Sequence, residues 1–203
     1  MNPFEINTQE ASIVFIGSFN PAIFHPEWLV RNGLIPADDL AGAKVEVVHN
    51  DISKFTLEWL GVDVLSNKFI ARTNDPSKFS PLKDLMISVF NVLEHTPIVQ
   101  IGLNLITDYK INSEENWHKI GDTLAPKTIW EQCLPKRVGL KSLKLVSPRP
   151  DELKGIMNVS IDSYGNEQIP YGVRFNINNH IEIERSSTPK ADRVISADNP
   201  WLD

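Results

Sequence analysis

The chain has 203 residues, and its 41% hydrophobic content excludes intrinsic disorder for the bulk of it. Twenty basic residues against 26 acidic ones give a net charge of -6 at pH 7, which argues against a protein that mainly coats nucleic-acid backbones. A single cysteine, Cys133, excludes an internal disulfide framework and a cysteine-rich zinc module.

The first half of the chain predicts a strand, a helix, three strands and a second helix, in that order. We expect these elements at residues 12–19 (strand), 25–33 (helix), 44–48, 54–60 and 66–73 (strands), and 80–93 (helix). In the first helix Pro26 suits the first helical position and Gly33 the position after the last turn. In the second helix Ser80 is the expected N-cap and Pro81 the first helical residue. An apolar stripe at helical spacing marks its buried face: Leu82, Leu85, Met86, Val89 and Leu93.

The same order of elements starts again after Pro97. Residues 98–102, Ile-Val-Gln-Ile-Gly, match residues 13–17, Ile-Val-Phe-Ile-Gly, at four of five positions. A helical region follows, opened by Ser113 and interrupted by Pro126. It precedes three strands, and a last segment resembles the start of the second helix. We expect the strands at 142–146, 156–162 and 173–184, and the last segment, 188–196, corresponds to residues 80–88.

These patterns predict a single α+β domain made of two similar halves, about residues 11–95 and 96–203. Each half is written strand, helix, three strands, helix (β-α-β-β-β-α). Short matches of common residues also arise by chance, so a true duplication and a coincidence both remain open. Two such units would join into one antiparallel sheet with helices on one face. This arrangement resembles the duplicated saddle of TATA-box-binding-protein-like folds; the resemblance concerns the fold pattern and implies no function.

The strand at 173–184 carries the candidate binding residues. Its odd positions are apolar except for Asn179, and its even positions are all polar, so the two sets face opposite sides of a sheet. The strand at 98–108 shows a weaker alternation, with Val99, Ile101, Leu103 and Leu105 expected inward and Gln100, Gly102, Asn104 and Asp108 outward. The polar set is either a solvated face or a platform for a partner; asparagine, which is depleted in strands, favours the platform. The candidate binding residues are Asn104, Arg174, Asn176, Asn178, His180 and Glu182. Phe15 and Phe19 are expected to add apolar anchors to this face.

Two pairs of residues are candidates for metal or acid-base chemistry. His180 with Glu182, and His49 with Asp51, offer nitrogen and oxygen ligands that suit a divalent ion in a metal-assisted hydrolase. For the first pair, a surface ion-pair ladder with Arg174 is the simpler interpretation. No nucleophile elbow and no phosphate-binding glycine loop occurs, so we expect no cofactor. We expect Cys133 to be a buried, inert thiol on an apolar helical stripe.

The function that we predict is a non-enzymatic binding or assembly module, acting through the polar face or an edge of the sheet. The partner would be another protein, or a second copy paired edge to edge in a homodimer. Nucleic acid is not expected, because the same face carries Asp108, Glu182 and Glu184.

No apolar stretch is long enough to span a membrane and no basic signal segment is present, which predicts a cytoplasmic protein without membrane contact. Trp201 is the tryptophan that we expect to reach a partner.

Overall fold

In the computed structural model nine strands form one antiparallel sheet, in the order β2-β3-β4-β5-β1-β6-β9-β8-β7. The structure describes residues 3–130, 133–134, 138–151 and 153–183. The strands are β1 (Phe4–Gly17), β2 (Lys44–Val48), β3 (Ile52–Thr56), β4 (Gly61–Leu65), β5 (Lys68–Thr73), β6 (Ile98–Ile111), β7 (Ser142–Pro148), β8 (Gly155–Tyr164) and β9 (Gly172–Glu182). The helices are α1 (Pro26–Arg31), α2 (Phe79–Val92) and α3 (Glu114–Leu124), with short 3₁₀ turns at Pro21–Ile23, Ala37–Gly42, Pro76–Lys78 and Thr128–Trp130.

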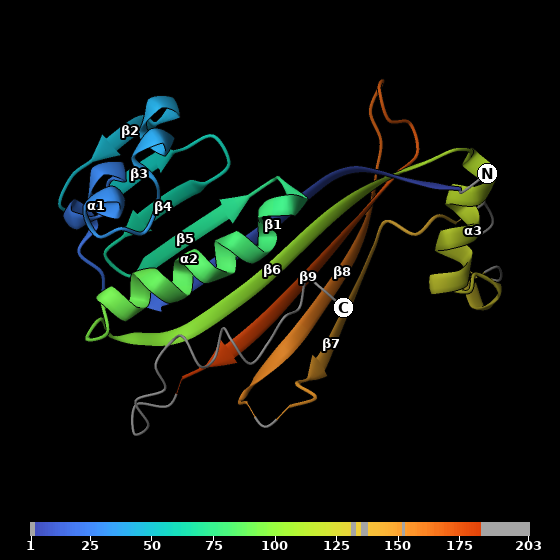
Figure 1. Cartoon of the computed structure of the whole chain (residues 1–203). Helices are drawn as coiled ribbons and strands as arrows, with labels where there is room; N and C mark the ends of the chain where they lie inside the picture. Colours follow the sequence, from blue (N-terminus) through green and yellow to red (C-terminus); the bar gives the residue numbers. More distant parts are fainter. Residues whose placement is uncertain (1–2, 131–132, 135–137, 152, 184–203) are drawn as a thin grey trace.

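The long strands β1 and β6 run side by side through the middle of the sheet and join its two halves (Figure 1). Their register pairs Ala11 with Leu105 and Phe15 with Ile101. On the outer side of β1 lies β5, the last strand of the first half, and on the outer side of β6 lies β9. The architecture is therefore α+β, as the sequence predicts.

The helices pack on the same side of the sheet. The apolar stripe of α2 is buried with Phe15, Phe69 and Ile101, and α3 packs against a second cluster that includes Ile111 and Val173. The pairing registers place these strand residues on one face, because they are opposite one another or separated by even numbers of positions along paired strands. Figure 1 shows α2 lying along β1 and β5 and α3 beyond the far end of β6.

Helix boundaries follow local chemistry where a cap is present. His25 accepts a hydrogen bond from the Trp28 amide at the start of α1, and Gly33, with φ of 68°, follows its last turn as predicted. The predicted cap Ser113 accepts a hydrogen bond from the Asn116 amide at the start of α3. Ser80, by contrast, is not the cap of α2, which already begins at Phe79. The turn before it is made by Asp75, whose carboxylate accepts from the Ser77 amide.

Several expectations about the first half are wrong. Four strands, not three, follow α1, because residues 57–60 form a tight turn between β3 and β4 in which the Leu57 amide donates to the Leu60 carbonyl. Leu57 and Leu60 are both buried, and this apolar turn resembles a strand in the sequence. Phe15 and Phe19 belong to the core below α2 and are not anchors on the polar side.

The region after α3 also differs from the prediction. The helix ends at Leu124, and the described residues beyond it hold only a 3₁₀ turn before β7. Cys133, expected to be buried, is exposed, and Trp130 is 48% exposed. The predicted segment 188–196, Glu184 and Trp201 lie outside the described residues. Within the described part of the chain, none of the helices has the length and apolarity needed to cross a membrane.

Candidate binding face

All six candidate binding residues lie on the side of the sheet opposite α2 and α3. We call this side the polar face. Its central part includes apolar residues such as Val14, Ile106 and Ile156 and a larger polar set. The polar set comes from even-numbered positions of four neighbouring strands: Ser12 of β1; Gln100, Asn104 and Asp108 of β6; Arg174, Asn176, Asn178, His180 and Glu182 of β9; and Asn158, Ser160 and Asp162 of β8. The alternation of the sequence along β6 and β9 therefore predicts the side to which these residues belong.

A row of side-chain amides crosses the middle of the polar face. The register places Ser12, Asn104, Asn178 and Asn158 opposite one another on β1, β6, β9 and β8. Asn158 Nδ2 donates to Asn178 Oδ1 at 3.2 Å, Asn178 Nδ2 donates to Asn104 Oδ1, and Asn104 Nδ2 donates to Ser12 Oγ at 3.2 Å. We call this the amide row. Each of its members is half-buried, so the row is both ordered by its own bonds and open to contact.

A charged pair lies beside the amide row. Arg174 donates to both oxygens of Asp108 at 2.7 Å, and Thr8 Oγ1 donates to Oδ2 of the same carboxylate at 3.0 Å. The Arg174 bonds lower the pKa of Asp108 below its usual value, with a further contribution from Thr8. The Asp108 side chain is 8% exposed, whereas that of Arg174 is 51% exposed. These residues border a hollow of about 630 Å³, which Glu10 and Ile106 also line.

Glu182 and His180 lie at the other end of β9. Glu182 pairs with Lys154 at 2.9 Å, and this hydrogen bond lowers the pKa of Glu182. Both side chains are well exposed, so the pair contributes little to stability. The predicted ladder with Arg174 is therefore wrong in its cation: Glu182 pairs with Lys154, whereas Arg174 pairs with Asp108.

The second predicted pair is far less enclosed. His49 Nδ1 lies 3.6 Å from Asp51 Oδ2 in the turn between β2 and β3, and their side chains are 64% and 87% exposed. Over the residues that the structure describes, no three His, Cys, Asp or Glu side chains gather closely enough to hold a metal ion. The hydrolase interpretation thus has two isolated pairs and no larger cluster in the described chain to build on.

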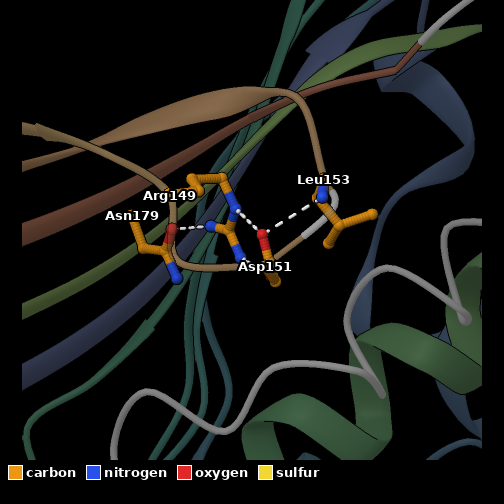
Figure 2. A network of polar contacts seen from close by, with 4 residues as sticks. All are labelled: Arg149, Asp151, Leu153 and Asn179. Carbon is orange, nitrogen blue, oxygen red and sulfur yellow. Dashed lines mark hydrogen bonds and ion pairs between the residues drawn. The ribbon is translucent and has the colours of Figure 1, made fainter.

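Asn179, the polar exception among the inward positions of β9, has a structural partner. Its side chain belongs to the side of the sheet that carries the helices, and the residue is 2% exposed. Figure 2 shows the guanidinium of Arg149, in the β7–β8 connection, donating to Asn179 Oδ1. Arg149 Nε also donates to Asp151 Oδ1 at 2.8 Å, and the same oxygen accepts from the Leu153 amide at 3.2 Å. The Arg149 side chain is 2% exposed, so this contact fixes the connection to the sheet.

Sequence reasoning missed three members of this arrangement. Ser12 and Asn158 belong to the amide row, and Thr8 supports Asp108. Asn158 lies at an even-numbered position of β8, and once the register with β9 is known this position places it opposite Asn178. Ser12 and Thr8 carry no such signal, because small hydroxyl residues are common in any strand.

No family model matches the chain, and no curated protein matches its sequence.

Proposed function

We propose that the protein is a non-enzymatic binding or assembly module whose contact surface for a cytoplasmic protein partner is the polar face. The observation that carries the proposal is the amide row, which spans four strands with side chains that are held in place yet half-exposed. An ordered surface loses little side-chain entropy when it binds, so its hydrogen bonds contribute more of their energy to affinity.

The hydrogen-bonding capacity of the amides supports this function. An asparagine amide has two donor hydrogens and an oxygen with two lone pairs. The bonds within the row engage one donor and one acceptor site of Asn178. The remaining capacity of this central residue suits backbone or side-chain amides of a protein, which likewise both donate and accept.

The charges of the face support a neutral partner over a nucleic acid. Arg174 lies against Asp108, and Lys154 against Glu182. Next to this area, Arg72 of β5 pairs with Asp63 of β4. Because each of these three cations is already matched by a carboxylate, none of them offers the unpaired positive charge that holds phosphates.

We also propose that the sheet arose by duplication and forms a saddle. In support, both halves place their last described strand beside their first, and β1 and β6 meet in the middle. The helices that follow β5 and β6 pack on the same side of the sheet. The polar face would then be the open side shared by the two halves.

The proposal is tested by one substitution on each side of the sheet. Asn178→Arg places a long cation in the centre of the amide row. Asn91→Arg makes the same chemical change at an exposed position of α2 and is the matched control. The tagged full-length chain is used to capture partners from cells that produce it, with quantitative mass spectrometry as the readout and circular dichroism to confirm folding.

We expect the wild-type chain and the Asn91→Arg variant to capture the same partner, and the Asn178→Arg variant to lose it. If both variants capture the same proteins as the wild type, the polar face is only a solvated surface and the proposal is wrong.

A further inference from the structure

The two edges of the sheet are protected to very different degrees. At one edge, β2 has five residues, a register shift between Val45 and Val47, and an ion pair at 2.7 Å between Glu46 and Lys54 of β3. Short length, irregular pairing and charge are the devices by which edge strands avoid pairing with another chain. This edge is therefore a poor template for a further strand.

The edge at β7 is neither short nor irregular, although it does carry Lys144 and Pro148. Its seven residues pair with β8 in an unbroken register from Ser142 to Pro148. Leu145 is 53% exposed and Val146 is 67% exposed, and because they are neighbours they project from opposite faces of the sheet. Within the described residues β7 has β8 as its only neighbouring strand, and all of its residues but Leu143 are exposed.

The hydrogen-bond pattern shows which backbone groups face outward. The Ser163 amide donates to the Lys141 carbonyl at 3.0 Å, which makes these residues a hydrogen-bonded pair one step beyond Ser142. In an antiparallel pair such residues alternate, so odd-numbered residues of β7 bond to β8 and even-numbered ones point away. The outward amides and carbonyls therefore belong to Ser142, Lys144 and Val146. Pro148, which has no amide hydrogen, falls at an outward position, where it costs no bond to β8.

We infer that β7 pairs with β7 of a second copy of this chain, in antiparallel orientation around a two-fold axis at Leu145. In this register the whole strand overlaps its copy, and the outward groups of Lys144 meet those of Val146 on the other chain. Leu145 lies opposite its own counterpart in a pair without backbone hydrogen bonds, where side chains approach most closely. The two exposed apolar residues are thus covered by the same contact.

The charge of Lys144 disfavours a neighbouring register, and closure of the assembly favours this self-pairing over pairing with the other edge of the sheet. An axis at Lys144 would place two ammonium groups directly opposite each other, which is unfavourable. Pairing of β7 with β2 of another copy would be a head-to-tail contact and would generate open filaments instead of a closed dimer. The inferred dimer extends the sheet and makes the polar faces of both copies continuous. It does not require that the polar face binds a partner.

The first experiment measures the oligomeric state of the full chain by sedimentation velocity over a range of concentrations. Val146→Pro removes an amide hydrogen that points away from β8, so the fold keeps its β7–β8 bonds. By symmetry two intermolecular bonds are lost, which should weaken the dimer by roughly 10- to 100-fold. Val146→Thr keeps both the amide and the branched shape and is the matched control, which should dimerise like the wild type. A wild-type chain that is monomeric or filamentous, or a dimer that survives Val146→Pro unchanged, overturns the inference.

The second experiment tests the register in a Cys133→Ser background. Cα atoms of a directly opposite pair without backbone hydrogen bonds are about 4.5 Å apart, within the range that a disulfide bridges. Leu145→Cys should therefore oxidise to a covalent dimer. Lys144→Cys should not, because in the inferred register residue 144 lies opposite residue 146 of the other copy and not opposite its own counterpart. Equal crosslinking at both positions, or none at Leu145→Cys, contradicts the register. Asn178→Arg should leave the dimer intact, so failure of the dimer and failure of the polar face as a binding surface are separate outcomes.

Discussion

Replacing Arg149 by methionine should destabilise the fold by about 2–3 kcal/mol. The Arg149 side chain is 2% exposed and donates to Asn179, itself 2% exposed. A hydrogen bond that involves a charged group contributes roughly 1.5–3 kcal/mol, and a buried acceptor deprived of its donor loses a comparable amount. Asp151 also accepts from Arg149, but its side chain is 37% exposed and regains water, so the loss of this bond adds little.

The converse substitution, Asn179→Leu, should cost a similar amount, because it takes an acceptor from a buried guanidinium. The double variant should cost much less than the sum of the two, about 0–1.5 kcal/mol, since two apolar side chains then occupy the space of the polar pair. The coupling energy that we expect from the cycle is about 4 kcal/mol, the amount by which the two single losses together exceed the loss in the double variant.

Urea unfolding followed by circular dichroism measures these differences. With a slope of roughly 2–3 kcal/mol per molar urea for a chain of this size, each single variant should lower the midpoint by about 1 M. Additive losses, with the double variant the least stable of the three, would refute the view that Asn179 is tolerated in the core because of Arg149.

Three further outcomes are expected. The pKa of Asp108 lies below its usual 3.8 because Arg174 donates to it, so the stability from this pair is present above that value and lost as pH falls. Between about pH 5 and pH 3 the free energy of unfolding should therefore fall less steeply in Asp108→Asn than in the wild type. An equal pH dependence of the two proteins would contradict this. Gly155→Ala should lower the free energy of unfolding by at least about 1–3 kcal/mol, because φ is 153° and a Cβ would lie 2.0 Å from the His180 carbonyl oxygen; a wild-type melting temperature would disprove the clash. Zinc should leave the melting temperatures of the wild type and His180→Ala unchanged, and a stabilisation confined to the wild type would revive the hydrolase hypothesis.

The second half of the chain is the part whose strands are best predicted from the sequence. Apart from Asn179, β9 alternates between apolar and polar residues, because one side is packed and the other half-exposed. This period of two identifies both the strand and its polar side. The cap at Ser113 and the proline at the first helical position, Pro26, are similarly local, since each depends on a few neighbouring residues.

The strands of the first half are predicted less well from the sequence because tertiary packing overrides the local pattern. Leu57 and Leu60 are buried in a turn, which hides the boundary between β3 and β4. Phe15 lies in a strand whose sequence does not tell which of its two sides faces the core. The docking of α2 decides this. The amide row likewise requires the strand order β1-β6-β9-β8, which joins residues 12 and 158 and has no local signal.

The most direct measurement of the polar face places a photo-activatable crosslinking residue at Asn176 and, in a separate chain, at Asn91 of α2. Irradiation of living cells that produce each chain should yield an adduct with another protein from position 176 and none of that identity from position 91. An adduct formed only from the helix side, or equally from both sides, would contradict the assignment of the polar face as the surface that binds.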